Sequence, residues 1–246
     1  NNFCGYVRCI LGKCKVTDML SQLSEIQTQI KDYNITVGQL TTKINELTLK
    51  IDEMTGDVVS IGKCGQNVDF VLYSDGRLLL KGTGATFDYS TDSNPSPLQN
   101  NANIKSVIVS EGMTGIGERL FQYCDNLKTV SLPTTLTAIK KAAFLPHIDG
   151  YICHQSLNGL TELRIPERVA ELGVNAFAGT AIKSVTVPSS VVTVGAMVFT
   201  ECQNLETVRY SGKIISDRMF ARCIRLKNLT LTKSVREIVG GCFNYC

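Results

Sequence analysis

The apolar residues in the first quarter of the chain recur every seven positions, from residue 16 to residue 61. The seam positions of these heptads are Val16, Met19, Leu23, Ile26, Ile30, Tyr33, Val37, Leu40, Ile44, Leu47, Ile51, Met54, Val58 and Ile61. This alternating spacing of three and four residues is typical of a coiled coil, because it keeps one apolar stripe facing a partner helix. A helix over this segment would be roughly 69 Å long. The pattern therefore predicts an oligomerisation stalk at residues 16–61.

The composition of the seam and its flanks bears on what covers it. The alternative is a single long helix that lies on the C-terminal part of its own chain. A helix with a sustained hydrophobic period near 3.5 supercoils, however, and one of this length extends beyond a small domain. Flanking positions such as Gln27, Thr41 and Thr48 are mostly uncharged, so ion pairs do not select a different partner chain. We expect a homo-oligomer. β-Branched residues at the first seam position of each heptad, with Leu at the second, favour dimers, but Ile, Met and Tyr also occupy the second position. A glycan on Asn34, beside the seam, would disfavour bundles of four or more helices, so a trimer is favoured.

A second periodicity begins near residue 103. Each unit has three apolar residues at i, i+3 and i+5, followed by an apolar residue that precedes a Phe by five positions. The triplets begin at Ile104, Leu127, Leu160, Ile182, Leu205 and Leu226, and the Phe residues are Phe121, Phe144, Phe177, Phe199, Phe220 and Phe243. Alternating apolar residues predict a short strand in each unit. Since one unit cannot bury its apolar side alone, about six units at 103–246 predict a solenoid with one insertion at 145–158.

The repeat N-L-x-x-V-x-L-P…I-G-x-x-A-F-x-x-C resembles the BspA-like leucine-rich repeats of bacterial and protist surface proteins. Asn126 through Pro133, Asn204 through Val208 and the Phe-x-x-Cys ends carry the resemblance, while His147 and Thr180 replace the terminal Cys in two repeats. The resemblance covers about residues 64–246 and implies a surface adhesion or interaction module. Residues 62–102 look like the hairpin that leads into such arrays, and Asp75-Gly76 supports a hairpin independently. The coiled coil is not part of the family pattern.

The fold class expected is thus an N-terminal α-helical coiled coil, then a β-hairpin cap and an α/β leucine-rich-repeat solenoid. Residues 1–15 form a separate Cys-rich segment before the stalk. No run of 18 apolar residues occurs, so the sequence predicts no membrane span. The start Asn1-Asn2-Phe3-Cys4 is what a processed secreted protein would show. The array stops at Cys246 without a polar capping unit, so we expect either missing residues or another subunit at that end.

Ten cysteines point to an oxidising compartment. Those that bracket the stalk are candidates for interchain disulfides, with intrachain pairing as the alternative: Cys4, Cys9, Cys14 and Cys64. The remaining disulfide candidates are Cys124, Cys153, Cys202, Cys223, Cys242 and Cys246. Those in the Phe-x-x-Cys ends could instead stay buried as small apolar side chains. Sequons at Asn34 and Asn228 make both residues glycosylation candidates.

The sequence shows no catalytic constellation, no phosphate-binding loop and no dinucleotide fingerprint, so no enzyme and no cofactor are expected. His147 and His154 fall in the insertion with Asp149 and Cys153, where a surface loop is favoured over a metal site. The charge is uneven: residues 16–61 are acidic, whereas residues 213–237 are basic. The basic residues considered as a patch are Arg218, Arg222, Arg225, Lys227, Lys233 and Arg236. Its partner would be an acidic coil or an anionic glycan rather than nucleic acid.

Together these features predict a secreted structural subunit that assembles through its coil and repeat contacts into an extracellular fibre or surface assembly. The alternative is an oligomeric stalked adhesin that binds host or glycan ligands through the repeat domain. Both hypotheses place the protein outside the cell or at its surface.

Overall fold

The computed structural model describes residues 21, 40, 42–45, 47, 57–90, 93–148 and 159–246. The chain forms two compact units, Asn1–Asp57 and Val58–Cys246. In the first unit the described residues 21, 40, 42–45 and 47 are helical. The rest of the heptad segment, with its seam and its oligomeric state, lies outside the described residues. Within the described residues, no helix is long and apolar enough to cross a membrane.

The predicted stalk is wrong at its C-terminal end. Val58 and Ile61 belong to strand β1 (Val58–Gly65) rather than to a helix. Val58, Val59 and Ile61 are all exposed, and β1 pairs antiparallel with the next strand. The run Val-Val-Ser-Ile is rich in β-branched residues, which suit an extended backbone better than a helix. A heptad pattern alone does not register this change of propensity.

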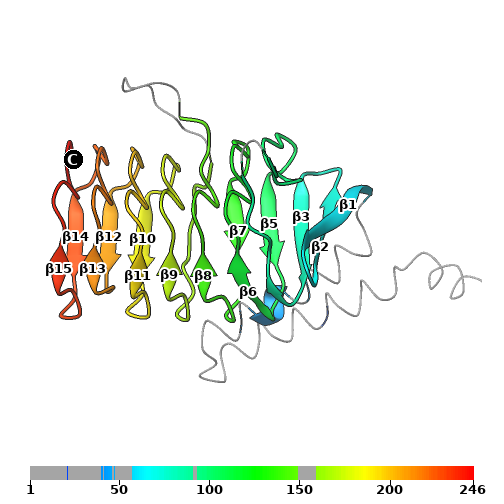
Figure 1. The fold of residues 1–246 in the computed structure, drawn as a ribbon, viewed down its shortest axis with the longest axis horizontal. Coiled ribbons are helices and arrows are strands. Elements are labelled where there is room, and N and C mark those ends of the chain that lie inside the picture. Colours follow the sequence, from blue (N-terminus) through cyan, green and yellow to red (C-terminus); the bar gives the residue numbers. More distant parts are fainter. Residues whose placement is uncertain are drawn as a thin grey trace, which may run out of the picture. The chain divides into compact units, whose positions relative to one another are not determined.

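The second unit begins with a three-stranded antiparallel cap made of β1, β2 (Val68–Tyr73) and β3 (Arg77–Gly82). The turn at Asp75-Gly76 joins β2 to β3, as the sequence predicts. Gly76 there has a φ of +93°, and its N–H donates to the Tyr73 carbonyl at 3.0 Å. Strand β3 then pairs in parallel with the first strand of the repeats. The cap is thus continuous with the solenoid (Figure 1).

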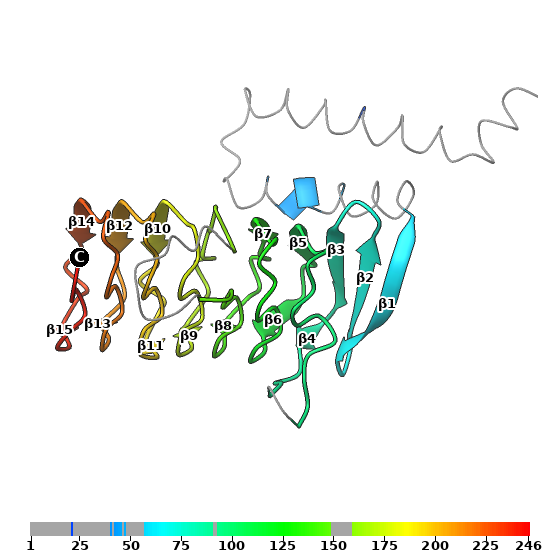
Figure 2. The ribbon, with the colours of Figure 1, turned by 90° about the horizontal axis from the view of Figure 1, so that it is seen from above.

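The predicted solenoid is confirmed as a stack of parallel strands in two rows along opposite sides of this unit (Figure 2). The first row holds β5 (Ser106–Val109), β7 (Thr129–Ser131), β10 (Ser184–Val187), β12 (Thr207–Tyr210) and β14 (Asn228–Leu231). The second row holds β4 (Gly84–Ala85), β6 (Met113–Ile116), β8 (Ala138–Ile139), β9 (Glu171–Leu172), β11 (Thr193–Val194), β13 (Ile214–Ile215) and β15 (Glu237–Ile238). Tight turns close each coil in the described residues of this unit, so the helices of the predicted α/β solenoid are not present there.

The repeated Phe forms the axis of the core. Neighbouring rings from Phe121 to Phe243 stack with centroids 5.2 to 5.7 Å apart. From Phe144 onward the rings are within 6° of parallel. The apolar triplets pack around this ladder, and Ile104, Val185 and Leu205 are among the buried residues. The core therefore runs along the whole stack, as a solenoid requires.

The sheet of the first row is interrupted at the third repeat. Residues 161–165 form no strand, although Leu160 and Ile165 are buried like their counterparts in the second and fourth repeats. The row therefore divides into one sheet that ends at β7 and another that begins at β10. The third repeat follows the insertion at 145–158. Its neighbours lack an insertion and keep the regular spacing of 22 to 23 residues.

Candidate functional site: the strand face of the solenoid

The outward surface of the first row is here called the strand face; it comprises the exposed side of β5, β7, residues 161–165, β10, β12 and β14. The strand register aligns its side chains into two lines that run across the coils. One line is Ser106, Thr129, Ser184, Thr207 and Asn228, and the other is Ile108, Ser131, Thr186, Arg209 and Thr230. In the third repeat Glu162 and Arg164 stand where the other coils have mostly hydroxyl side chains. The strand face is therefore polar, with a charged break in its middle.

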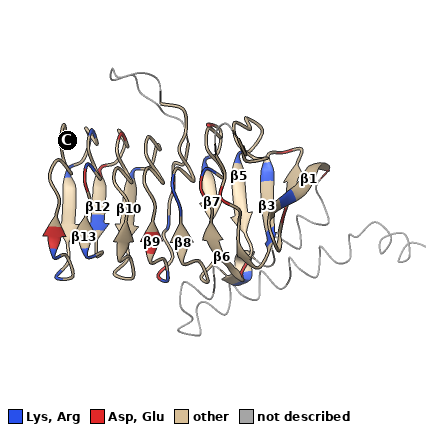
Figure 3. Ribbon diagram, in the orientation of Figure 1, with Lys and Arg blue, Asp and Glu red and all other residues tan. Residues whose placement is uncertain are grey.

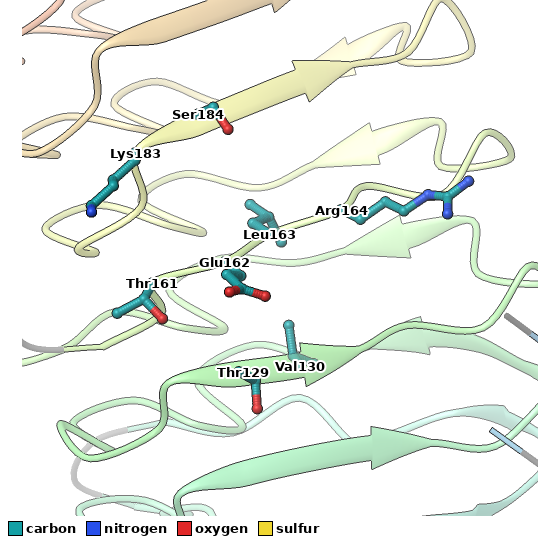
Figure 4. Close-up of a pocket in the computed structure, with 8 residues that line it drawn as sticks. All are labelled: Thr129, Val130, Thr161, Glu162, Leu163, Arg164, Lys183 and Ser184. Atoms are coloured by element: carbon teal, nitrogen blue, oxygen red, sulfur yellow. The ribbon is translucent and has the colours of Figure 1, made fainter. Parts of the chain in front are cut away.

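A hollow of about 490 Å³ lies at that break. It is lined by Thr129, Val130, Thr161, Glu162, Leu163, Arg164, Lys183 and Ser184. Figure 4 shows Lys183 and Arg164 at opposite ends of the hollow, with Glu162 between them. Hydroxyl, carboxylate and cationic groups thus surround one shallow space that three consecutive coils build.

The hollow exists because the third coil starts in register and then leaves the ladder. The Thr161 N–H donates to the Lys128 carbonyl at 3.0 Å, and the Thr161 hydroxyl reaches the same oxygen at 3.2 Å. Beyond this point, no backbone hydrogen bond joins residues 162–165 to β7 or β10 in the part of the chain described. Backbone donors and acceptors at this position are consequently open to water or to a ligand.

The second row carries a different kind of surface. A shallower depression there is lined by Glu118, Lys140, Lys141, Glu171, Leu172, Gly173, Val174, Thr193, Val194 and Gly195. Its charges are mixed, and the Lys140 ammonium lies 2.7 Å from the Asp88 carboxylate. Burial works against both charges, yet the hydrogen bond to Lys140 lowers the pKa of Asp88 and the same bond raises the pKa of Lys140. Mutual pairing leaves this side less suited than the strand face to a charged ligand.

The cysteines of the repeats form a ladder of thiols. The Sγ atoms of Cys202, Cys223 and Cys246 donate to the carbonyl of the Phe in the preceding repeat, at 3.1 to 3.3 Å. Cys124 donates to the Leu98 carbonyl at 3.0 Å in the same way. Thr180, which replaces Cys in the third repeat, lies 3.4 Å from the Cys202 Sγ and continues the line.

The described cysteines form no disulfide within the chain, and the structure favours the alternative of buried thiols for the repeat cysteines. Those present as free thiols are Cys64, Cys124, Cys202, Cys223, Cys242 and Cys246. Cys124, Cys202 and Cys223 are buried and each has a carbonyl acceptor, so these side chains are satisfied without an S–S bond. Cys64 is fully buried in the core, so its thiol does not face a second chain as the interchain prediction required. Cys4, Cys9, Cys14 and Cys153 lie outside the described residues.

The insertion and the sequons are only partly described. His147 stacks on Tyr123 with centroids 4.2 Å apart, and its Nδ1 lies 2.9 Å from Asp125 Oδ2, so its ring has a structural role on the surface. His154 and Asn34 lie outside the described residues. Asn228 is exposed on β14, where a sequon is accessible, and its occupancy stays a prediction. Among the residues described, no group of three or more His, Cys, Asp or Glu could hold a metal.

The basic patch expected at 213–237 is not one surface. Arg222 pairs with Glu201 at 3.3 Å and lies over the Tyr245 ring, in the turns that close the coils. The Arg225 guanidinium donates to the Asn204 side chain. Arg236 instead lies directly before β15 of the second row, where its N–H donates to the Lys213 carbonyl. Figure 3 shows basic and acidic residues distributed over both rows of strands. Residues that are close in sequence do not form one surface here, because successive residues of a solenoid coil face different sides.

Stacked coils of a parallel strand, a tight turn and a second short strand around a common apolar core define a leucine-rich-repeat solenoid. Residues 91–150 and 148–246 match the BspA type Leucine rich repeat region, in six copies, and the chain belongs to this family. No curated protein sequence matched the chain significantly.

Three solved structures share the fold at low identity. A leucine-rich repeat protein from Bacteroides ovatus is 20% identical with a TM-score of 0.53, over 73% of this chain and 49% of that one. One from Eubacterium ventriosum is 22% identical with a TM-score of 0.50, over 74% and 62%. The T. pallidum Leucine Rich Repeat protein is 22% identical with a TM-score of 0.52, over 72% and 87%. The chain thus spans about half the length of the first of these proteins.

Sequence reasoning missed the hollow. The signal available was the replacement of Ser or Thr by Glu162 and Arg164 directly after the insertion. It was not decisive, because the apolar triplet of this repeat is intact and predicts a strand like the others.

Proposed function

We propose that this protein is an extracellular or surface interaction module that binds a ligand across its strand face. The interrupted ladder at residues 161–165 is the observation that carries the proposal, because it provides a hollow with open backbone groups and convergent polar side chains. Insertions in solenoids commonly place binding surfaces on one face, and the insertion at 145–158 precedes this hollow. Membership of the BspA-type family supports the location. Binding rather than catalysis is proposed.

Replacing the charged residues of the hollow tests this proposal. The variant Glu162→Thr/Arg164→Thr restores the hydroxyl pattern of the neighbouring coils, so we expect it to fold normally and to lose the contacts specific to the hollow. Binding of the fluorescently labelled full chain to a glycan array and to immobilised matrix proteins should fall at least about tenfold at the ligands recognised, as expected when two polar anchors are removed.

The matched control is Lys141→Thr/Glu171→Thr on the second row, which also removes one cation and one anion. It should bind like the unmodified chain. Equal binding by all three proteins to every ligand recognised would exclude the strand face as the binding surface.

Self-assembly is the second candidate function. The heptad seam favours it, because a sustained apolar stripe at residues 16–61 is typical of helices that associate with further copies of the same chain.

A further inference from the structure

A row of basic residues runs along the edge of the strand face. The residue before each strand of the first row, and the equivalent residue Thr161 in the third repeat, form the series Lys105, Lys128, Thr161, Lys183, Glu206 and Lys227. Backbone hydrogen bonds align them: the Lys128 N–H donates to Lys105 O at 2.8 Å, and the Thr161 N–H to Lys128 O at 3.0 Å. On the far side of the hollow, the Glu206 N–H donates to Lys183 O at 2.8 Å, and the Lys227 N–H donates to Glu206 O at 3.0 Å. Four lysines therefore share one line, here called the lysine row.

The lysine row makes the strand face basic as a whole. From β5 to β14 the strand face and the lysine row together carry six cations: Lys105, Lys128, Arg164, Lys183, Arg209 and Lys227. Glu162 and Glu206 are the acidic residues on the same surface. Lys105, Lys183 and Lys227 are exposed, so their ammonium groups reach solvent. A surface of one predominant charge steers and holds ligands of the opposite charge.

The neighbouring side chains narrow the class of ligand. The line of Ser106, Thr129, Ser184, Thr207 and Asn228 lies next to the lysine row and offers hydroxyl and amide hydrogen bonds. Aromatic residues are missing from the outward positions of these strands, as far as the structure describes them. A single-stranded nucleic acid needs aromatic platforms for its bases. A polyhydroxylated polymer that carries sulfate or carboxylate groups needs only cations and hydrogen-bonding groups in register.

We propose that the lysine row, with the hydroxyl line beside it, binds an anionic polysaccharide that crosses the coils over the hollow. The inference rests on the proposed function and specifies its ligand. With strands about 4.8 Å apart, the row from Lys105 to Lys227 spans roughly 24 Å, which accommodates several sugar residues. The ammonium groups act as point charges for anionic groups, and the hydroxyls hold the sugar rings.

Charge removal along the row is the direct test. The variant Lys105→Gln/Lys183→Gln/Lys227→Gln removes three exposed cations and leaves Lys128 in place, because the Lys128 Nζ also donates to the Asp125 carbonyl. The control Lys213→Gln/Arg218→Gln/Arg236→Gln removes three exposed cations of the C-terminal repeats outside the row. Surface plasmon resonance would measure full-chain binding to immobilised heparin and alginate, with neutral dextran, oligo(dT) and anionic phospholipid vesicles as comparisons.

We expect the unmodified chain to bind heparin and alginate but not dextran, with an affinity that falls as salt is raised. The row variant should bind at least about tenfold more weakly, and the control should bind within about twofold of the unmodified chain. Equal losses in the two triple variants, or equal binding of oligo(dT) or vesicles, would overturn the proposal in favour of unspecific charge attraction.

These outcomes separate the two proposals. If the hollow variant Glu162→Thr/Arg164→Thr loses its array ligands while heparin and alginate do not bind, the strand face is a binding surface and the anionic polysaccharide is refuted. If the substitutions on the strand face and in the lysine row reduce binding in neither experiment, both proposals fail.

Discussion

At the scale of single residues, the fold depends on positions where a side chain would not fit. The Gly of the Ile-Gly motif lies against the backbone of the preceding coil. An added Cβ would come within 2.0 Å of Phe87 O at Gly117, and within 2.3 Å of a backbone nitrogen at both Gly173 and Gly195. The motif in the sequence thus encodes the close approach of stacked coils.

Gly173→Ala should therefore destabilise the solenoid by about 3 kcal/mol, because the new methyl group forces adjacent backbones apart. Gly240→Ala is the matched control, since a Cβ there meets nothing within 4 Å, and its effect should stay within about 0.5 kcal/mol. Thermal unfolding followed by circular dichroism would measure both. Similar unfolding midpoints for the two variants would refute the steric argument.

The left-handed backbone positions are a second residue-scale regularity. Positive φ recurs two residues before the repeat Phe, at Arg119, Ala142, Asn175, Met197, Arg218 and Gly241. Only the last of these is a Gly, although the left-handed conformation is energetically unfavourable for residues that have a Cβ. The turn geometry of the repeat overrides local preference here, which is why these positions have no consistent signature in the sequence.

At the scale of elements, the thiol ladder links neighbouring coils. Burial raises the pKa of Cys124 and Cys202 to about 12, and burial followed by the nearby Asp69 charge does the same for Cys64. In the unfolded chain a thiol has an ordinary pKa near 9. Between these values the unfolded state has released a proton that the folded state retains, so the unfolded state is favoured as pH rises.

The stability contributed by these thiols is accordingly complete below about pH 9 and decreases as the pH rises towards 12. Cys202→Thr should weaken this alkaline loss, because Thr180 shows that a hydroxyl is accommodated at the equivalent position. Urea unfolding midpoints at pH 8 and pH 10.5 would compare the variant with the unmodified chain. An identical pH dependence of the two proteins would contradict the role of the buried thiol.

The strands show how far elements follow from sequence. The triplets of the repeats locate β5, β7, β10, β12 and β14 correctly, because alternation of buried and exposed positions is a local property of a half-buried strand. The same triplet at Leu160, Leu163 and Ile165 yields no strand. Whether a strand forms there depends on hydrogen bonds with coils 22 to 33 residues away, which no local pattern contains.

At the scale of the whole molecule, the heptad segment and the solenoid raise the question of assembly. The heptads predict a homo-oligomer. Two described seam residues differ in exposure, since Ile44 is 41% exposed and Leu47 is 1% exposed, so the association of chains stays a prediction from the heptad pattern.

Ile30→Asp/Ile44→Asp should reduce the solution mass of the full chain from an oligomer, three chains by the seam pattern, to one chain, because charges in an apolar seam oppose association. The control Ser21→Asp/Thr28→Asp adds the same charges opposite the seam, at positions where heptads face solvent, and should keep the oligomer. Light scattering coupled to gel filtration would measure the mass. A monomeric unmodified chain would refute the coiled-coil prediction.

The sequence by itself determined the number of repeats, the Phe ladder, the hairpin at Asp75-Gly76 and the family, because each rests on periodic spacing or local turn chemistry. Only the tertiary structure decided the fate of the cysteines, the dispersal of the basic residues, the strand at Val58 and Ile61, and the break at 161–165. These depend on which coil lies next to which, and on where each side chain points within a coil. The lysine row illustrates the difference: its successive members are 23 to 55 residues apart in sequence, and only the stacking of the coils places them on one line.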